Sequence, residues 1–320
     1  MVNKRSQIDG HQGPKYLVTG ASGFIGNALC KRLLDRNAIV IGTSRREVSF
    51  DTPNWRYVPV DLAEAKDVDQ LFAEVQPNYV IHLASCVTGK REIEWVRATF
   101  DGNLRSTVNV LVAARQTGVD KLVLAGSLEE PDADETHPVA ASPYAASKWC
   151  ASTYARMMHA LYGTRSSVAR IFMVYGPGQA DLAKLVPYVC LAASRGEAPK
   201  LMSGERPVDW IYIDDVVDGL IRLAQAGPDD GSYVDLGSGN LVTTGEVAAR
   251  ICTLSEADVV PQLGAVPDRP MEQVRKADIQ ATADVLGWRP ETGLDEGLRQ
   301  TLDWYRMLAA RMDEEQQTSG

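Results

Sequence analysis

Short apolar runs alternate with helical patterns over the first half of the chain, and this alternation is what most constrains its fold. The five runs predicted to be buried strands are Lys15–Thr19, Ala38–Gly42, Trp55–Val60, Tyr79–Leu83 and Lys121–Ala125. Helices are predicted between them, for example over Asn103–Gln116. Strands alternating with helices predict an α/β fold with a Rossmann-type, doubly wound parallel sheet. Right-handed crossovers then place a ligand at the carboxyl ends of the strands.

The alternation weakens after Tyr175, where turn-rich stretches begin. Ile211–Ile213 and Tyr233–Leu236 are predicted to be strands that return to the main sheet. We therefore expect a main domain over 14–175, with 210–240 returning to it, and a smaller C-terminal α/β lobe over 176–209 and 241–310. The polar termini, 1–13 and 311–320, are expected to be flexible.

Composition excludes several functional classes. The 320 residues carry a net charge of −9, which argues against a nucleic-acid or anionic-membrane partner. No apolar run is long enough to span a bilayer, and the first dozen residues lack the apolar core of a signal peptide. Five scattered cysteines and four histidines show no metal-ligand spacing, so we expect reduced thiols, a cytoplasmic location and no metal.

A glycine triple lies between the first predicted strand and its helix. Gly20, Gly23 and Gly26 suit a pyrophosphate, because glycines allow close approach and a helix N-terminus offers free N–H groups. Their spacing, G-x-x-G-x-x-G, differs from the usual G-x-G-x-x-G fingerprint. The alternative is a glycine-rich turn with no ligand.

The end of the second predicted strand indicates which dinucleotide would bind. NAD sites usually place an acidic residue here, but the sequence is Thr43-Ser44-Arg45-Arg46, with no carboxylate before Glu47. Hydroxyls and guanidiniums can instead hold a 2′-phosphate, which favours NADP(H) over NAD(H). The alternative is that one or both arginines are solvated. Asp61, after the third strand, could accept from the adenine amine or simply cap a helix.

Tyr144 and Lys148 lie four residues apart at the start of a predicted helix. Ser142 before Pro143 provides an N-cap followed by a first-turn proline. The spacing stacks a phenol and an ammonium on one helical face, and a nearby cation lowers a tyrosine pKa toward neutrality. The phenol would then serve as a general acid or base. Taken alone, the pair also fits an ordinary amphipathic face.

Together these motifs resemble the extended short-chain dehydrogenase/reductase family, in its nucleotide-sugar branch. The resemblance rests on the glycine triple, Asp61-Leu62, His82–Ser85, Ser127, Tyr144 with Lys148, Arg170–Pro177, Asp209–Asp215, and Arg269–Glu272 with Ala277-Asp278. Within that branch, Gly42–Arg45, Gly126–Glu130 and Gly176–Gln179 look most like the GDP-4-keto-6-deoxymannose reductases and related NADPH-dependent 4-ketoreductases.

The resemblance implies an NADPH-dependent reduction of the 4-keto group of a nucleotide-diphospho-4-keto-6-deoxyhexose. Ser127 would hydrogen-bond the carbonyl, Tyr144 would protonate the developing alkoxide, and Lys148 would keep the tyrosine pKa low and hold the nicotinamide ribose. The implied cofactor-binding residues are Gly20, Ser22, Gly23, Phe24, Ile25, Gly26, Ser44, Arg45, Arg46, Asp61, Leu62, Leu83, Ala84, Ser85, Tyr144 and Lys148.

Substrate binding is where the chain departs from the branch. Met173 and Val208 stand where relatives carry an Asn and an Arg that help hold the diphosphate region. The residues expected to contact the substrate are Glu129, Met173, Arg206, Arg269 and Glu272, with Arg275 as a further candidate. Leu128 occupies the position where dehydratases of the branch carry an Asp. Glu129 is expected to line the sugar pocket and Glu130 to be solvated, with a catalytic role for either as the lesser alternative.

Two other functions fit the same motifs. The chain could be a nucleotide-sugar 4-epimerase or dehydratase with tightly bound NAD, or a noncatalytic NADP-sensing protein on the same fold. By analogy with the family we also expect a homodimer, formed through Asn103–Gln116 and Tyr144–Tyr162.

Overall fold

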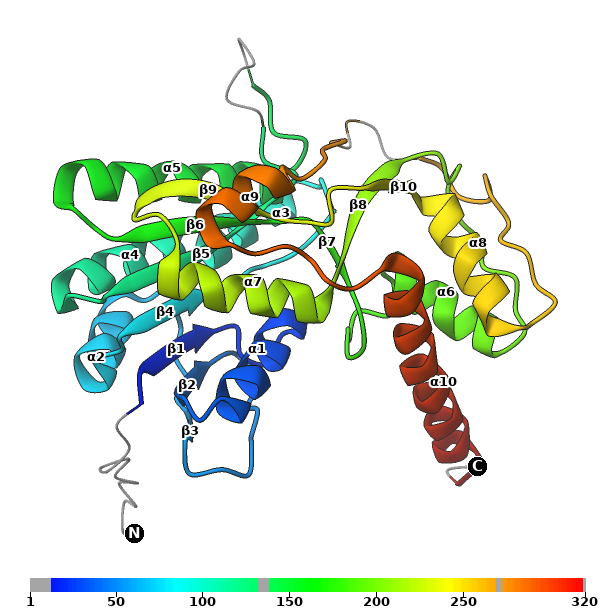
Figure 1. Cartoon of the computed structure of the whole chain (residues 1–320), viewed down its shortest axis with the longest axis horizontal. Helices are drawn as coiled ribbons and strands as arrows, with labels where there is room; N and C mark the ends of the chain where they lie inside the picture. Colours follow the sequence, from blue (N-terminus) through cyan, green and yellow to red (C-terminus); the bar gives the residue numbers. More distant parts are fainter. Residues whose placement is uncertain (1–12, 132–137, 269–270, 272, 319–320) are drawn as a thin grey trace. The chain divides into compact units, whose positions relative to one another are not determined.

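A computed structural model describes residues 13–131, 138–268, 271 and 273–318 (Figure 1). The chain divides into two compact units. The first unit comprises Met1–Ala169 and Leu220–Val234, and the second comprises Arg170–Gly219 and Asp235–Gly320. No helix in the described residues is both long and apolar enough to cross a membrane.

The first unit is built on a seven-stranded sheet in the order β3-β2-β1-β4-β5-β6-β9. Its strands are β1 Lys15–Thr19, β2 Ile39–Thr43, β3 Trp55–Tyr57, β4 Tyr79–His82, β5 Lys121–Ser127, β6 Ser166–Ile171 and β9 Asp230–Leu236, the last two ending in residues of the second unit. The pairs formed by the first five strands are parallel. The predicted Rossmann-type α/β fold is confirmed. The strands are nearly continuous apolar runs because both faces of a parallel sheet are buried.

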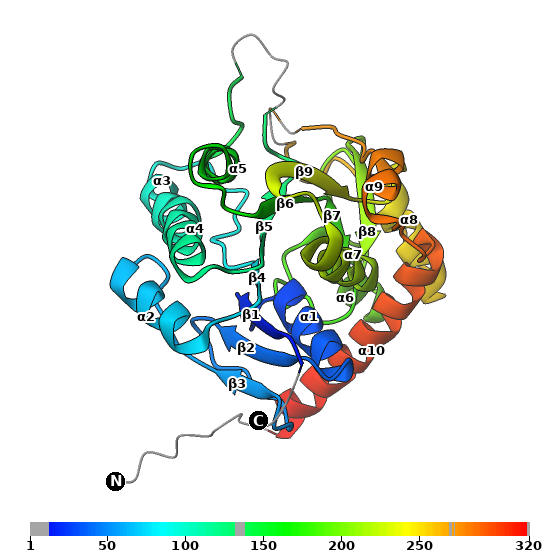
Figure 2. The same ribbon diagram turned by 60° about the vertical axis from the view of Figure 1, so that its left-hand side comes forward.

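Helices cover the two faces of this sheet, as Figure 2 shows. The helix α1 (Phe24–Asp35) lies on one face, while α2 (Ala65–Val75), α4 (Ser106–Thr117) and α5 (Pro143–Tyr162) lie on the other. A core of buried side chains fills this second interface, including Leu17, Ile41, Phe72, Val80 and Leu111. Its burial is the main favourable term that holds the strand ends in place.

The helix α4 is preceded by α3 (Glu94–Thr99) and a π-helical segment, η1 (Phe100–Arg105). A π-helical turn widens the backbone and often marks a functional site. The helix α5 begins at an N-cap, as predicted, because the Ser142 side chain accepts a hydrogen bond from the Ala145 amide at 3.1 Å. Pro143 occupies its first position.

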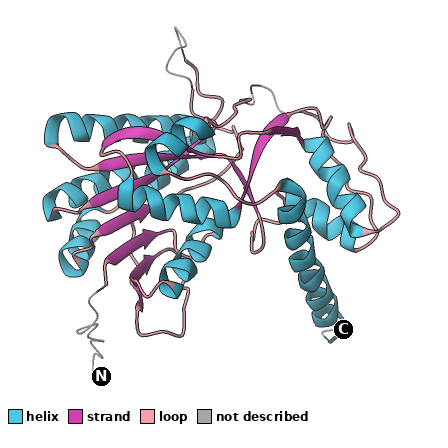
Figure 3. Ribbon diagram, viewed as in Figure 1, coloured by secondary structure: helices cyan, strands magenta, loops and turns pink. Residues whose placement is uncertain are grey.

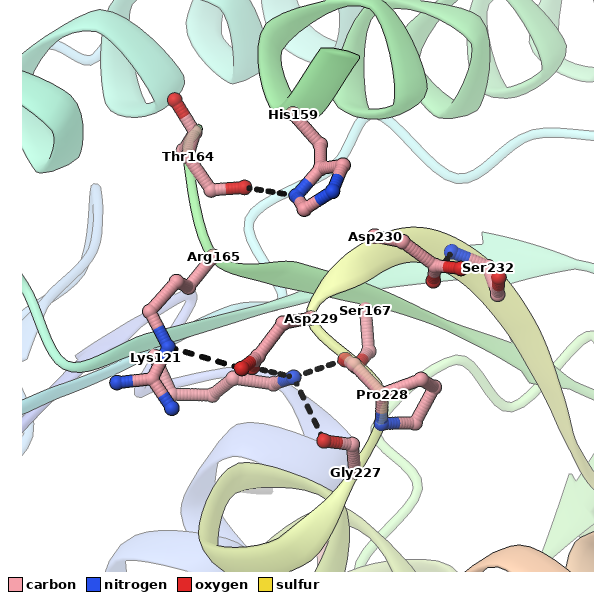
Figure 4. A network of polar contacts seen from close by, with 10 residues as sticks. All are labelled: Lys121, His159, Thr164, Arg165, Ser167, Gly227, Pro228, Asp229, Asp230 and Ser232. Carbon is pink, nitrogen blue, oxygen red and sulfur yellow. Dashed lines mark hydrogen bonds and ion pairs between the residues drawn. The ribbon is translucent and has the colours of Figure 1, made fainter. Parts of the chain in front are cut away.

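A buried lysine joins the amino ends of β5, β6 and β9, at the sheet edge opposite the strand ends that carry the predicted site (Figure 4). Lys121, whose side chain is 4% exposed, donates to Asp229 Oδ1 at 2.8 Å and to the carbonyls of Gly227 and Pro228. Arg165 donates to the other Asp229 oxygen at 2.9 Å. A buried ammonium needs a paired charge, so Lys121 holds the residues just before β9, Gly227 to Asp229, against the sheet.

The second unit contains a three-stranded sheet in the order β10-β8-β7. Its strands are β7 Met173–Tyr175, β8 Pro207–Tyr212 and β10 Leu241–Thr243, and its helices are α6 Leu185–Ser194, α8 Thr244–Ser255, α9 Ile279–Leu286 and α10 Leu294–Thr318 (Figure 3). The helix α7 (Ile213–Ala226) runs from the second unit into the first. Within the first unit, its Gln225 donates to the Tyr16 hydroxyl at 3.1 Å.

One expectation about the second half is corrected. Ile211 and Tyr212 of the predicted strand Ile211–Ile213 belong to β8 in the small sheet, and Ile213 begins α7, so this segment does not return to the main sheet, whereas Tyr233–Leu236 does so as part of β9. Strand signals identify a strand but not its partner. The tail from residue 311 continues α10 as far as Thr318, because its Arg, Met, Glu and Gln residues are strong helix formers, and its flexibility stays a prediction.

Candidate active site

The glycine turn after β1 can accept only glycine at two of its positions. Gly20 has a φ of +70°, and a Cβ there would lie 2.8 Å from the Ala84 amide nitrogen. A Cβ on Gly26 would lie 2.1 Å from the Gly20 carbonyl oxygen. The start of α1 therefore lies tightly against the turn that follows β1, and that turn lies against the segment after β4. The predicted residue Ser22 lies in this turn, and Phe24 and Ile25 begin α1; all three are partly exposed.

The N-terminus of α1 has the features of a phosphate site. Its N-cap, Gly23, offers no side-chain hydrogen bond to the first helical amides, and no acidic residue lies in the first turn. Free N–H groups and the positive end of the helix dipole favour an anion here. The cradle therefore fits the pyrophosphate of a dinucleotide.

The segment after β2 carries the predicted 2′-phosphate residues. Arg45 and Arg46 are exposed, and neither forms an ion pair with any residue in the described ranges. Ser44 donates its hydroxyl to the Arg46 carbonyl at 2.6 Å, and its own carbonyl accepts from the Tyr57 hydroxyl at 2.5 Å. The loop is thus shaped by local hydrogen bonds that leave both guanidiniums available.

Asp61 and Leu62 behave differently from each other. Asp61 is exposed, and its Oδ1 accepts from the Ala63 amide at 3.0 Å, the local capping contact that was the alternative to adenine binding. Among the described residues, no hydrogen-bond donor contacts its second carboxylate oxygen. Leu62 packs into the core, while its carbonyl accepts from the Asn109 side chain at 2.9 Å.

The segment after β4 is held by two buried polar residues. Thr19 Oγ1 accepts from the Ala84 amide at 3.1 Å and contacts His82 Nδ1 at 2.8 Å. Asn103 accepts from the Ser85 hydroxyl at 3.0 Å and the Cys86 amide at 2.6 Å. The predicted cofactor residues Leu83, Ala84 and Ser85 therefore lie in a backbone fixed from two sides, next to the glycine turn.

Ser127, Tyr144 and Lys148 come together in the first unit. Ser127 is the last residue of β5, and its side chain lies beside the Tyr144 phenol, whose pKa it lowers. The Lys148 ammonium lies 5.9 Å from the centre of the Tyr144 ring and donates to the Ala125 carbonyl at 2.8 Å. Lys148 is 5% exposed and Ser127 7%. The structure therefore brings the three predicted catalytic side chains to the carboxyl end of β5.

The pKa of Tyr144 differs from the sequence expectation. Burial raises the pKa of this phenol, and the nearby Glu130 and Glu129 charges raise it further, whereas only the Ser127 hydrogen bond lowers it. Lys148 therefore does not bring the Tyr144 pKa toward neutrality in the cofactor-free protein. Its own pKa is lowered to about 8 by burial, against the opposing effect of Glu130. At neutral pH the phenol is a proton donor beside a charged lysine.

His82 lies behind Lys148 and stays neutral. Burial, together with the Lys148 charge, lowers the pKa of His82 to about 3. Its ring nitrogens contact Thr19 at 2.8 Å and Thr107 at 3.1 Å. Because both nitrogens are occupied, His82 ties β4 to β1 and α4 and is not a proton carrier.

Glu130 contradicts its expected solvated position. Its side chain is fully buried, with 0% exposure, and its Oε1 accepts from the Ser127 amide at 2.6 Å. Glu129 is half-buried, and its amide donates to Ser127 Oγ at 3.2 Å. The error arose because a Glu before a Pro in a turn is usually exposed. No local pattern shows that partners from later elements bury it.

Sequence reasoning also missed Asn103. It was only the first residue of a predicted helix, yet it is 1% exposed and lies in η1, where its amide donates to Ser147 Oγ at 2.9 Å. It therefore links the segment after β4 to α5 between Tyr144 and Lys148. No local pattern indicated this role, because an asparagine at the start of a predicted helix is an ordinary capping residue.

The predicted substrate residues lie in both units or outside the described residues. Glu129 belongs to the first unit, and Met173, half-buried at the start of β7, and Arg206 belong to the second. Arg206 donates to the Gln273 carbonyl at 3.0 Å. Arg269 and Glu272 fall outside the residues that the structure describes. Val208, which replaces the family Arg, is 3% exposed in β8.

The motif residues Asp209 and Asp215 have structural partners within the second unit. Asp209 accepts from the amides of Ser238, Gly239 and Ala277 at 2.6–2.9 Å. Asp215 accepts from the amides of Glu291 and Thr292 at 3.0 and 3.1 Å. Each carboxylate thus satisfies backbone donors of a loop, which explains why the motif is built around acids.

Comparison with known proteins agrees with this geometry. The family model described as the NAD dependent epimerase/dehydratase family matches residues 16–235. The UDP-glucose 4-epimerase of Mycolicibacterium smegmatis is 31% identical, over 91% of this chain and 98% of that protein. The dTDP-glucose 4,6-dehydratase 1 of Escherichia coli is 28% identical, over 91% of this chain and 92% of that protein.

A solved structure gives the same result. The Thermus thermophilus UDP-glucose 4-epimerase in complex with NAD superimposes with a TM-score of 0.80 at 28% identity, covering 91% of this chain and 99% of that one. The relatives named here are nucleotide-sugar epimerases and a dehydratase, so the similarity supports the superfamily predicted from the sequence. The chain belongs to the NAD dependent epimerase/dehydratase family.

Proposed function

We propose that the protein is a nucleotide-sugar 4-ketoreductase that uses NADPH and returns a nucleotide-linked deoxysugar. The observation that carries this proposal is that Ser127, Tyr144 and Lys148 meet at the carboxyl end of β5, with a phenol that burial keeps protonated. A protonated phenol is the form that a carbonyl reduction requires at its start.

The cofactor residues of the first unit fit an NADP(H) molecule. The pyrophosphate would lie at Gly20–Gly26, the 2′-phosphate at Arg45 and Arg46, and the nicotinamide ribose near Tyr144 and Lys148. When bound, the reduced nicotinamide supplies a hydride to the carbonyl carbon. An exchangeable reduced cofactor suits a reductase, which must release the oxidised form after every turnover.

The chain's own residues would then handle the proton. Ser127 Oγ, held by the Glu129 amide at 3.2 Å, would donate a hydrogen bond to the carbonyl oxygen. Tyr144 would give its phenolic proton to that oxygen as negative charge develops on it. Lys148, charged below about pH 8, would stabilise the resulting phenolate until water returns the proton. Proton transfer of this kind contributes roughly 10²–10⁴-fold in rate.

A dehydratase function is disfavoured by Leu128. This side chain is 6% exposed and apolar, and it follows Ser127 directly, where the branch's dehydratases carry an acid for the leaving hydroxyl. No proton donor replaces it at that position. The product we propose is therefore an alcohol at C4.

The direct test is NADPH oxidation, measured at 340 nm, with a panel of nucleotide-linked 4-keto-6-deoxy sugars. We expect one or more of them to be reduced, with the alcohol identified by mass spectrometry. Tyr144→Phe should lower kcat by at least about 100-fold and leave NADPH affinity within about twofold, because only the proton donor is lost. A variant that turns over at the wild-type rate would eliminate the proton-donor role. A wild-type protein that binds NADPH but reduces no member of the panel would favour the noncatalytic NADP-sensing alternative.

A 4-epimerase with tightly bound NAD is the second candidate, supported by the 31% identity to the Mycolicibacterium smegmatis protein. An epimerase retains its hydride, so it changes the sugar with no net oxidation of cofactor. Incubation with UDP-glucose and related hexoses, followed by chromatography, separates the two functions. Epimerisation without NADPH consumption would replace the reductase proposal.

Cofactor preference has a separate test. Arg45→Asp should weaken NADPH binding by about 1.5–3 kcal/mol, because charge-assisted hydrogen bonds to the 2′-phosphate are lost, and NADH binding by much less. Titration of protein fluorescence with each cofactor measures both. Lys66→Asp on the exposed face of α2 is the matched charge control, and equal losses for NADPH and NADH in Arg45→Asp would rule out the assignment.

A homodimer through α4 and α5 remains part of the proposal. Val112 on α4, and Tyr154, Leu161 and Tyr162 on α5, are between 37% and 67% exposed. Such apolar groups favour contact with a second copy. Light scattering of the wild type and of Tyr154→Glu tests this point.

A further inference from the structure

Glu130 is a fully buried acid next to the candidate active site. In the described residues, the groups that hydrogen-bond to its carboxylate are all donors. Its Oε1 accepts from the Ser127 amide at 2.6 Å, and its Oε2 accepts from the hydroxyls of Ser152 and Tyr233, both at 2.8 Å. The Glu130 amide in turn donates to the Ser127 carbonyl at 3.2 Å. A carboxylate only accepts, so three donors match it, and one of them, the backbone amide, can do nothing but donate.

These contacts join three elements around the catalytic serine. Ser127 ends β5, Ser152 lies on α5, and Tyr233 lies on β9. On α5, Tyr144, Lys148 and Ser152 follow one another at four-residue intervals, so they share one helical face. Glu130 therefore holds the serine against the same face that carries the phenol and the ammonium.

The charged groups around this carboxylate are few and identifiable. Its negative charge raises the pKa of Lys148 and of Tyr144, against the lowering of the Lys148 pKa by burial. His82, which also faces Lys148, is neutral, and Glu129 acts on Tyr144. Arg156 of α5 lies over the far side of the Tyr233 ring, with its guanidinium carbon 5.4 Å from the ring centre.

We propose that Glu130 is a positioning residue of the active site, which fixes Ser127 through its amide and acts as the buried counter-charge that keeps Lys148 an ammonium. The effect on turnover rests on the proposed function, whereas the effect on Lys148 does not. The acid belongs neither to the reacting pair nor to the cofactor cradle. Its role is to hold the serine and the lysine in the state that proton donation by Tyr144 needs.

The substitution Glu130→Gln removes the charge of this side chain and keeps its shape. Glutamine keeps an oxygen for the Ser127 amide and an amide group for the two hydroxyls, which can turn to accept. It removes only the negative charge. The Lys148 ammonium should then lose its proton at a lower pH, by on the order of one pH unit for the loss of one nearby charge.

The experiment is an NMR titration of cofactor-free protein labelled at lysine Cε, with the Lys148 signal assigned by its loss in Lys148→Arg. The wild-type midpoint is expected near pH 8. Glu130→Gln should lower it, while Glu129→Gln, which removes the same charge from the next residue, should leave it unchanged. A folded Glu130→Gln protein with the wild-type midpoint overturns the proposal.

The pH dependence of the rate is a second measurement, because a change in side-chain packing alone would not shift the pH at which the rate falls. In the pH profile of ketone reduction at saturating NADPH, the alkaline limb of Glu130→Gln should move by the same amount as the NMR midpoint. For a one-unit move, the charged fraction of Lys148 at pH 8 falls from about one half to about one eleventh, and the rate about fivefold. A uniform loss at every pH, with no shift, contradicts the counter-charge role.

Two further results keep the proposal testable if a variant or the activity fails. Should Glu130→Gln not fold, hydrogen exchange of the Ser127 amide in the wild type decides, because exchange at an unprotected rate would show that the carboxylate does not bind it. Should no keto sugar be reduced while the Lys148 midpoint still moves, the reductase function fails and the role of Glu130 on Lys148 stands.

Discussion

Replacing Lys148 with methionine should make the cofactor-free protein more stable at neutral pH, although it removes a residue of the proposed site. Lys148 is 5% exposed, and within the described residues its ammonium donates one hydrogen bond, to the Ala125 carbonyl at 2.8 Å. Burial lowers the pKa of Lys148 from its ordinary 10.5 to about 8. At pH 7 the folded protein therefore holds a charge that its surroundings disfavour.

The size of the effect follows from that pKa. Each pKa unit corresponds to about 1.4 kcal/mol, so lowering the pKa from 10.5 to about 8 costs the folded state about 3 kcal/mol at pH 7. Methionine has a similar length and no charge, which removes this cost. It leaves the Ala125 carbonyl without its donor, at a cost of about 1 kcal/mol. We expect Lys148→Met to raise the free energy of unfolding by about 2 kcal/mol.

The gain should depend on pH in a defined direction. Between about pH 8 and 10.5 the unfolded chain binds the lysine proton and the folded chain does not, so the wild type gains stability as the pH rises. At about pH 9.5 the cost has fallen to roughly 1 kcal/mol, close to that of the lost hydrogen bond. Variant and wild type should then be equally stable.

Urea unfolding followed by far-ultraviolet circular dichroism, at pH 7 and 9.5 and without cofactor, measures both differences. Lys66→Met, on the exposed face of α2, is the matched control and should change stability by less than about 0.5 kcal/mol at either pH. The reasoning is refuted if Lys148→Met is less stable than the wild type at pH 7, or if its difference from the wild type is the same at both values.

Two further substitutions test the cofactor cradle and its support. Gly26→Ala would place a Cβ 2.1 Å from the Gly20 carbonyl oxygen, so NADPH affinity should fall at least about tenfold by fluorescence titration, whereas Gly293→Ala, with open space around it, should bind normally. Asn103→Ala leaves the partly buried Cys86 amide, which donates to Asn103 at 2.6 Å in the wild type, without an acceptor. It should lower the free energy of unfolding by about 1–3 kcal/mol in urea, and an unchanged midpoint would contradict this role.

Features that depend on neighbouring residues could be predicted from the sequence. The Ser142 cap with Pro143 fixed the start of α5, and the four-residue spacing placed Tyr144 and Lys148 on one helical face. The glycine turn follows from Gly20 and Gly26, where steric limits act within a few residues. The sheet follows from apolar runs whose alternation with helices leaves few allowed topologies.

Features that depend on partners far apart in the sequence could not be predicted from it. Glu130 is buried because Ser152 and Tyr233, 22 and 103 residues later, supply its donors, and no local pattern contains them. The strand β8 has apolar residues like those of the main sheet, and only its tertiary partners place it in another sheet. The sign of the Tyr144 pKa change depends in the same way on burial and on surrounding carboxylates.

The sequence by itself therefore determined the Rossmann-type layout and the shared helical face of Tyr144 and Lys148, because helix geometry, steric exclusion and strand alternation act over short stretches of chain. Ser127 was predicted only through the family resemblance. Only the tertiary structure decided the charge state in which those groups meet. Desolvation and the field of Glu130 are set by what surrounds a side chain in three dimensions, and that is fixed when β5, α5 and β9 pack together.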